Sequence, residues 1–170
     1  KAWTQLSTTG GASSLARSGH SAVVYNNSMY VFGGDDGSKK NDVWKLDLTS
    51  NKWTVITTTR TAPSARTGHS AVVNGVSMYV FGGASLSSDD VTYKLDLTSN
   101  EWTVITITGT PPSARTGHSA VVDNGNMYVF GGDDGTISIP SKKNDVWKLD
   151  LTSQPPTWNE VAKNGTKPSA

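Results

Sequence analysis

The stretch Ala65–Gly83, ARTGHSAVVNGVSMYVFGG, sets the architecture of the protein because the chain carries it in three copies. The other two copies, ARSGHSAVVYNNSMYVFGG and ARTGHSAVVDNGNMYVFGG, begin at Ala16 and Ala114, so the spacing is 49 residues both times. Repetition at a fixed period of about 20 to 50 residues is typical of proteins built from stacked, similar units. One copy and the residues that follow it therefore form the structural unit.

Each unit predicts four short strands, which in the first unit cover Ser21–Tyr25, Met29–Phe32, Val43–Leu48 and Trp53–Ile56. Polar and apolar residues alternate most clearly in the third strand, and Asn, Gly, Ser and Thr separate the strands. No window shows the i, i+3, i+4 apolar spacing of a helix. We expect an all-β fold of four-stranded antiparallel sheets that pack radially, as the blades of a propeller do, because both faces of each sheet are too apolar to stay in water.

Two features of the unit suit such packing. A Gly-Gly pair follows the second strand, where the backbone needs a positive φ or a close approach to its neighbour. A Trp opens the fourth strand and is large enough to fill the wedge between adjacent blades. The glycines are Gly33, Gly34, Gly82, Gly83, Gly131 and Gly132, and the tryptophans are Trp53, Trp102 and Trp158.

Together these features resemble the kelch motif, which has a double glycine after an apolar strand, an aromatic residue several positions later, and then a Trp. The variant Pro-X-Ala-Arg-X-Gly-His-Ser, at Pro63–Ser70 and Pro112–Ser119, is similar to that of Rab-effector kelch proteins and of fungal cell-tip (tip-elongation) kelch proteins. The resemblance covers nearly the whole chain. It implies a kelch-type β-propeller but indicates little about activity, because this fold hosts many functions.

The units predict three blades, at residues 17–57, 66–106 and 115–162. Residues 1–8 resemble the last strand of a preceding blade, and residues 163–170 resemble the start of a following connection. Three blades make half, or part, of a roughly six-bladed ring, and an open half would expose two apolar blade faces. We therefore expect further blades, either from a longer chain or from a second copy in a homodimer.

The composition narrows the classes of partner. Fifteen Lys and Arg residues against fourteen Asp and Glu residues give a net charge of +1, whereas nucleic-acid and membrane-surface binders usually carry a basic excess. Apolar runs such as Met78–Phe81 are far too short to span a bilayer. The absence of Cys excludes disulfides and thiolate metal sites. Lys1 opens no signal-peptide pattern, so we expect a cytoplasmic protein, with an extracellular one as the alternative.

Residues present in every unit are expected to be structural. We expect each repeated His to hydrogen-bond a loop within its own blade, with a metal site on the propeller axis as the alternative. We expect each repeated Arg to pair with a carboxylate, for which one Asp recurs in every unit, with a ligand-binding ring of arginines as the alternative. The histidines are His20, His69 and His118, the arginines are Arg17, Arg66 and Arg115, and the aspartates are Asp47, Asp96 and Asp150.

The residues that differ between units lie mainly in the loops after each Gly-Gly pair, at residues 35–41, 84–89 and 133–144, which we call the Gly-Gly loops. Antiparallel alternation of the strands places them on the same face as the connections between units, and we expect this face to bind a partner. The candidate partner-binding residues are Asp35, Asp36, Lys39, Lys40, Arg60, Leu86, Asp133, Asp134, Ile137, Ile139, Lys142 and Lys143.

Three of these candidates, Leu86, Ile137 and Ile139, are apolar side chains in otherwise polar loops. They suit the anchors of a partner-binding patch, or they pack down on their own blade. The two Asp-Asp-Gly sequences, which start at Asp35 and Asp133, favour plain Asp-Gly turns over calcium sites, because further spaced acids and a closing Glu are missing.

No acid–base or nucleophile–base constellation stands out, so we predict a protein that is not an enzyme and that uses no cofactor. Among enzymes known on this fold, galactose-oxidase-like proteins need a Tyr cross-linked to Cys, and plant specifier proteins need a spaced Glu, Asp and His set that neither Glu101 nor Glu160 supplies. We expect a protein–protein interaction scaffold that presents the Gly-Gly loops and the connections between units. The alternatives are a carbohydrate-binding propeller, or part of a kelch-fold enzyme with its active site in other blades.

Overall fold

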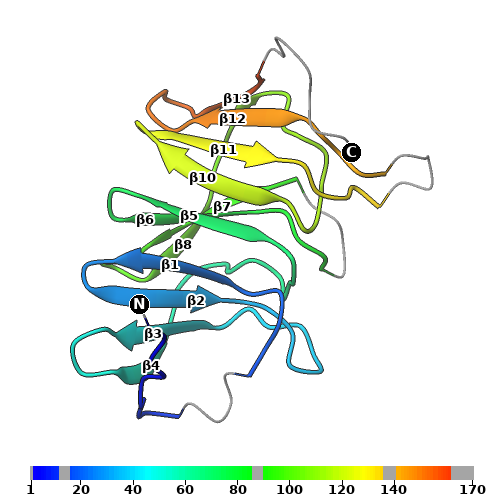
Figure 1. Ribbon diagram of the computed structural model, residues 1–170. Coiled ribbons are helices and arrows are strands. Elements are labelled where there is room, and N and C mark those ends of the chain that lie inside the picture. Colours follow the sequence, from blue (N-terminus) through cyan, green and yellow to red (C-terminus); the bar gives the residue numbers. More distant parts are fainter. Residues whose placement is uncertain (1, 12–15, 86–89, 136–140, 162–170) are drawn as a thin grey trace.

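The chain forms three antiparallel β-sheets that stack side by side (Figure 1). The computed structural model describes residues 2–11, 16–85, 90–135 and 141–161, and no helix occurs among them. The first sheet contains β1 (Ser21–Tyr25), β2 (Ser28–Phe32), β3 (Val43–Asp47) and β4 (Lys52–Ile56). The second contains β5 (Ser70–Asn74), β6 (Ser77–Phe81), β7 (Thr92–Asp96) and β8 (Glu101–Val104). The third contains β10 (Ser119–Asp123), β11 (Asn126–Phe130), β12 (Val146–Asp150) and β13 (Thr157–Glu160), with β9 (Thr108–Gly109) at its edge.

Each sheet is a meander in which every strand pairs with the next along the chain, as the turn residues predict. In the first sheet Val24 lies opposite Met29, which lies opposite Leu46, which lies opposite Trp53. These four side chains therefore share one face, because residues directly opposite each other in a sheet point the same way. The all-β fold of four-stranded antiparallel blades is confirmed.

The third sheet has a fifth strand that the sequence analysis missed. Thr108 and Gly109 of β9 pair in parallel with Thr157 and Trp158 of β13. This short strand belongs to the connection between the second and third units, so the connection runs along the outer edge of the next sheet. Parallel bridges from Thr9 to β4 and from Thr59 to β8 repeat the arrangement in the other two sheets.

The assignment of residues 1–8 to the last strand of a preceding blade stays a prediction. Residues 2–8 carry no strand in the structure, and the Trp3 side chain is fully exposed. A fourth strand forms only beside the third strand of its own blade, which would belong to that preceding blade. The sheets themselves span 21–56, 70–104 and 119–160, apart from the short edge strand β9 at 108–109.

The core lies between the sheets rather than inside any one of them. One buried cluster joins Phe32 and Tyr30 of the first sheet to Met78, Leu95 and Trp102 of the second. An equivalent cluster joins the second sheet to the third, and contains Val72, Phe81, Met127, Val129, Leu149, Leu151 and Trp158. The first strands β1, β5 and β10 lie beside one another, so they mark the narrow side of each wedge. This radial packing is that of propeller blades.

The two ends of the sheets form different surfaces. In Figure 1 the turns between first and second strands and between third and fourth strands lie on the left, and the described parts of the Gly-Gly loops lie on the right. The second strand of every sheet ends at the Gly-Gly loop, and the first strand begins there. We call this the loop face, and it carries the candidate site.

Candidate functional site

The loop face is built on the Gly-Gly pairs, which let the next unit approach closely. Gly33 has a φ of +63°, a conformation that side chains disfavour. A Cβ atom on Gly33 would also lie only 2.8 Å from Cε1 of His69 and 3.0 Å from the Arg66 carbonyl oxygen. Both reasons that the sequence suggests for a glycine, positive φ and close approach, therefore apply at this position.

Backbone hydrogen bonds tie the first Gly-Gly loop to the connection that follows the first sheet. The Gly34 amide donates to the Arg66 carbonyl at 2.9 Å, and the Arg66 amide donates to the Lys40 carbonyl at 2.9 Å. The next joint repeats the first of these bonds, from the Gly83 amide to the Arg115 carbonyl at 2.8 Å. The bases of the first two loops are thus held by the next unit, not only by their own sheets.

The repeated arginines lie beneath the loops and hold the first glycine of each pair. Nη1 of Arg17, Arg66 and Arg115 donates to the carbonyl of Gly33, Gly82 and Gly131, respectively, at 2.8 to 2.9 Å. The side chains of Arg66 and Arg115 are buried, so their guanidinium groups belong to the interior of the loop base. A buried guanidinium needs such hydrogen bonds to offset the loss of water.

The arginine–carboxylate pairs form, but with other aspartates than the sequence suggested. Arg17 binds Asp42 and Arg115 binds Asp145 through two hydrogen bonds each, and the shortest distance in each pair is 2.6 Å. The indole of Trp44 donates to the same Asp42 carboxylate at 2.7 Å. Burial acts to raise the pKa of Asp42, but the hydrogen bonds from Arg17 and Trp44 outweigh it and leave the pKa below its usual value. Asp145 has the same arrangement and the same direction of pKa shift.

The recurring aspartates Asp47, Asp96 and Asp150 instead close the turns at the opposite end of the sheets. Oδ1 of Asp47 accepts hydrogen bonds from the Thr49 and Ser50 amides at 2.9 and 2.8 Å. These amides lower the pKa of Asp47. In the second sheet, hydrogen bonds from Thr98 and Ser99 lower the pKa of Asp96 to about 2. Their recurrence in every unit therefore reflects local turn chemistry.

The residues around the repeated arginine differ in the second unit. Val91 occupies the position of Asp42 and Asp145, one residue before the third strand. The Arg66 guanidinium lies over the ring of Tyr93, 5.0 Å from its centroid. Tyr93 occupies the position at which the other two units have Trp. The second unit thus has Val and Tyr where the first and third units have Asp and Trp. This cation–π contact adds to the hydrogen bonds that Arg66 donates to the Gly82 and Ser64 carbonyls.

The repeated histidines join neighbouring units, which corrects the expectation that each bonds within its own blade. Nε2 of His69 lies 2.9 Å from Oγ of Ser21, on the preceding sheet, and Nε2 of His118 lies 2.8 Å from Oγ of Ser70. Burial, with a contribution from the Arg66 charge, lowers the pKa of His69 to about 3. Burial and the Arg115 charge lower the pKa of His118 to about 4. Both imidazoles are therefore neutral near pH 7, whereas His20, on the first unit, is exposed.

The tryptophans fill the wedge between sheets. Trp102 packs on Phe32 of the preceding sheet with ring centroids 5.1 Å apart, and Trp158 packs on Phe81 at 5.3 Å. Both indoles are buried, whereas Trp53, which has no preceding sheet, is only half-buried. The His and the Trp of one unit thus contact the same Phe of the unit before it.

The tips of the Gly-Gly loops carry most of the candidate partner-binding residues. Oδ1 of Asp35 accepts a hydrogen bond from the Gly37 amide at 2.8 Å, and Oδ1 of Asp133 accepts one from the Gly135 amide at the same distance. These bonds are those of an Asp-Gly turn. Lys39 reaches the neighbouring loop, where its Nζ donates to the Ser85 carbonyl at 3.3 Å.

The charges at these tips are largely paired within their own loops. Lys40 pairs with Asp36 at 3.0 Å, Lys143 pairs with Asp134 at 2.5 Å, and Lys142 pairs with Asp133. The loop face therefore presents both signs of charge side by side instead of a field of one sign. The apolar candidates Leu86, Ile137 and Ile139 lie outside the described residues.

Arg60 is not brought to the loop tips. It lies in the connection after the first sheet, at a φ of +63°, and pairs with Glu101 at 3.4 Å. Glu101 opens β8 directly after the turn between the third and fourth strands, so Arg60 lies toward the opposite end of the second sheet. The connection runs along the outer edge of the sheet before it returns to the loop face, which the strand pattern did not reveal.

Sequence reasoning missed the residues that receive the repeated side chains. The repeated His hydrogen-bonds Ser21 or Ser70 of the preceding sheet, and the repeated Trp packs on Phe32 or Phe81. Asp42 pairs with the repeated Arg of its own unit. The signal was present, because Ser and Phe recur in all three units at the start of the first strand and the end of the second. Which repeated residue contacts which depends on the fold, because the partners lie 48 residues apart in the His–Ser pairs.

Among the described residues, no group of three or more His, Asp or Glu side chains is close enough to hold a metal ion. The same residues include no helix that is long and apolar enough to cross a membrane.

Comparison with known proteins agrees with this architecture. A 45-residue stretch of the chain is 44% identical to the Leucine-zipper-like transcriptional regulator 1 homolog of Drosophila melanogaster. The match covers 25% of the chain and 5% of the length of that relative. Residues 19–170 match the KLHDC2/KLHL20/DRC7 Kelch-repeats domain. The chain therefore belongs to the kelch-repeat family.

Proposed function

We propose that the chain is a non-catalytic scaffold that binds a protein partner through its loop face. Kelch-repeat domains are in general protein-interaction modules. One observation carries the choice of surface: loop tips that differ in sequence stand on bases that share repeated residues. Every base contains the Gly-Gly pair and an Arg that donates to its first glycine, and at the two joints between sheets the second glycine donates to the next Arg carbonyl.

A rigid base lowers the entropic cost of binding, because the partner does not have to order the residues at the base of the loops. The bond from Lys39 to the Ser85 carbonyl links the first loop tip to the second, so tips from neighbouring sheets form one surface. Paired charges of both signs suit a protein partner with a mixed polar rim better than a polyanion. The candidate contact residues on this surface are Asp35, Asp36, Lys39, Lys40, Asp133, Asp134, Lys142 and Lys143.

The test compares two exposed lysines on opposite ends of the first sheet. The variant Lys39→Glu changes the loop face, and the control Lys52→Glu changes the residue opposite Asp47, beside the turn at the other end. Immobilised chains would be used to capture proteins from a lysate, with quantitative mass spectrometry of the bound fraction. We expect a partner retained by the parent chain and by Lys52→Glu to be at least tenfold depleted on Lys39→Glu.

Equal retention on both variants would remove the loop face as the binding surface. Failure to capture any protein, together with binding on a glycan array, would replace the proposal with carbohydrate recognition.

We also propose that the two open sides of the sheet stack are covered by further blades.

A further inference from the structure

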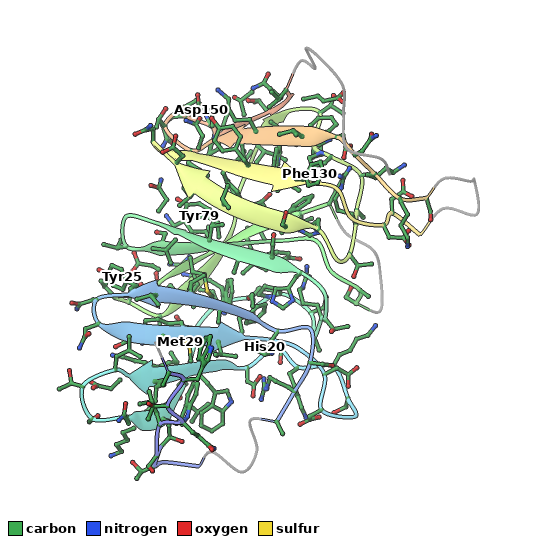
Figure 2. The ribbon with its side chains drawn as sticks, in the orientation of Figure 1. His20, Tyr25, Met29, Tyr79, Phe130 and Asp150 are labelled. Carbon is green, nitrogen blue, oxygen red and sulfur yellow. The ribbon has the colours of Figure 1, made fainter. Side chains whose placement is uncertain are left out.

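The wedge between the second and third sheets holds a cleft of about 340 Å³ at its outer edge. The lining comes from the second sheet, from the start of the connection after β8, and from the turn between β12 and β13. Figure 2 labels Tyr79, which lines the cleft on the second sheet, and Asp150, the last residue of β12 before this turn. No described residue of a Gly-Gly loop lines it, so the cleft is separate from the loop face.

The first wall of the cleft is a row of three side chains on the second sheet. Tyr79 lies opposite Lys94, and Lys94 lies opposite Thr103. Residues directly opposite each other point the same way, so the three side chains share one face. Val72 lies opposite Tyr79 and is buried in the cluster between the second and third sheets, so this face packs on the third sheet. Lys94 is partly buried and Thr103 is exposed, so the row leads from the core out to solvent.

The second wall is the turn between β12 and β13, which is longer than its counterparts. In the first and second units two residues separate the Ser of this turn from the Trp of the last strand, whereas four separate them in the third unit. The longer turn contains Gln154, Pro155 and Pro156, and all three line the cleft. An insertion found in one unit only thus supplies this wall.

The first sheet carries a similar row of side chains but a different hollow beside it. Tyr30, Lys45 and Thr54 lie opposite one another in the same way. The hollow beside Lys45 and Thr54 is lined by described residues of the first sheet alone, and the acid Asp47 is among them. Lys45 is therefore a matched reference for Lys94, because it has the same place in its row but lies outside the two-walled cleft.

Lys94 gives the cleft its charge. It is the only charged residue among the described residues of the lining. Within the described part of the chain its side chain has no ion-pair or hydrogen-bond partner. Asp96, two residues along β7 on the same face, binds the Thr98 and Ser99 amides through Oδ1 at 2.8 and 3.0 Å. The Lys94 ammonium group can therefore donate charge-assisted hydrogen bonds to a carboxylate in the cleft.

The rest of the lining is mainly apolar. Aliphatic surface comes from Val104, Ile105, Leu151, Pro155 and Pro156. Val104 is 50% exposed and Leu151 is 8% exposed, so this surface runs from the rim into the core of the wedge. Pockets that bind small molecules are typically mostly apolar, contain a few polar groups and enclose about 300 to 1,000 Å³. The cleft has all three properties.

We propose that this cleft binds a small organic acid, with its carboxylate on Lys94 and its apolar part between the second sheet and the turn at residues 154–156. The volume suits a compact ligand, and the one positive charge suits a single carboxylate. Thr103, opposite Lys94, adds a hydroxyl donor for the carboxylate. The cleft is then a second binding site, independent of a protein partner on the loop face.

The test uses 3-phenylpropionate as the acid and 3-phenylpropanamide as its neutral analogue. Each is titrated into the isotope-labelled chain, and the backbone amide signals of Lys94, Val104 and Leu151 are followed by NMR. We expect saturable shifts with the acid and a Kd of about 1 mM or lower. The amide should bind about tenfold more weakly, because it cannot accept a charge-assisted hydrogen bond.

Two lysine variants locate the charge that binds the acid. Lys94→Met keeps the length of the side chain and removes its charge, so it should raise the Kd of the acid about tenfold. The Kd of the amide should be the same for this variant and for the parent chain. Lys45→Met, the matched control on the first sheet, should leave both Kd values unchanged.

A shortened turn tests the second wall. Replacement of residues 154–156 by a single Asn gives the third unit the turn length of the other two. This variant should lose the binding of both compounds while its NMR spectrum stays dispersed. If the shortened chain does not fold, Lys94→Met and its control decide the result.

Several results would overturn the proposal. The absence of saturable shifts with the acid would remove the site, and equal affinity for the acid and the amide would remove the role of Lys94. Equal losses in Lys94→Met and Lys45→Met would show that only the overall charge matters. A folded short-turn variant that still binds the acid would place the ligand elsewhere. Lys39→Glu should leave the Kd unchanged, so the loop-face proposal and this one can fail separately.

Discussion

Gly33 illustrates how one residue serves the joint between two units. Its φ of +63° and the nearness of His69 Cε1 both exclude a side chain. Gly75, in the turn between β5 and β6, has nearly the same φ of +61°, but a Cβ atom added there would meet no atom within 4 Å. At Gly75 a side chain would meet only the unfavourable φ, whereas at Gly33 it would meet the unfavourable φ and crowding by neighbouring atoms. Comparing the two positions therefore distinguishes the two costs.

We expect Gly75→Ala to lower the free energy of unfolding by about 1 kcal/mol, from the unfavourable φ alone. Gly33→Ala should lower it by about 2 to 4 kcal/mol, because crowding against His69 and the Arg66 carbonyl adds to the same backbone term. Urea denaturation of both variants measures the difference. Equal losses would mean that the loop base moves aside without cost.

The buried histidines make the stability of the protein depend on pH. Unfolding returns the pKa of His69 from about 3, and that of His118 from about 4, toward the ordinary value of 6.5. As the pH falls below 6.5, the unfolded chain therefore binds protons that the folded chain does not bind. The folded state loses stability over this window, with a slope of up to about 1.4 kcal/mol per pH unit for each histidine.

The prediction is a steady fall in the free energy of unfolding between pH 7 and pH 5, measured by urea denaturation. The double variant His69→Gln/His118→Gln should be less stable at pH 7 but should show a flatter dependence in this window. The lowered pKa values of Asp42 and Asp145 cause a further loss only at lower pH, near the ordinary aspartate value of 3.8. An unchanged slope in the double variant would contradict the assignment to these histidines.

At the scale of the strand, side chains on the same face of the outer strand β8 differ in how deeply they are buried. On β8 the Trp102 side chain is buried against Phe32, whereas Val104, two residues on and on the same face, is half-exposed. The sequence predicts both the strand and the Trp that fills the wedge. It does not predict the edge strand β9, because two residues, Thr108 and Gly109, are too short a segment to show a pattern.

Trp102→Ala should lower the free energy of unfolding by about 3 to 5 kcal/mol, because it empties the wedge between the first and second sheets. Val104→Ala, on the same strand, should cost less than about 1 kcal/mol, since the valine is already half in water. Chemical denaturation at one fixed protein concentration checks both values. Similar losses at the two sites would show that the inter-sheet wedge is not the main source of stability.

At the scale of the whole molecule, stability comes from joints between neighbouring units. Each sheet buries its apolar faces only against the sheets beside it, as in other repeat proteins. Among the described residues the middle sheet packs on a sheet on both sides, and the first and third sheets each pack on one. The middle sheet should therefore open least often.

Native-state hydrogen exchange of the chain tests this expectation. The amides of β6 should exchange slowest, and those of β2 and β11 should exchange faster by at least tenfold. Uniform exchange across the three sheets would indicate that the stack opens as one unit.

The amino-acid pattern was enough to predict the three units, their strands, the Gly-Gly turns and the wedge-filling Trp. These features depend on local chemistry that recurs in all three units, such as alternation, positive φ and turn composition. The folded arrangement was needed to show that His69 binds Ser21 of the preceding sheet, that Arg17 binds Asp42 rather than Asp47, and that Arg60 lies away from the loop tips. The physical reason is that in a strict repeat every unit offers the same partners, so spacing alone cannot show whether a contact lies within a unit or crosses to the next.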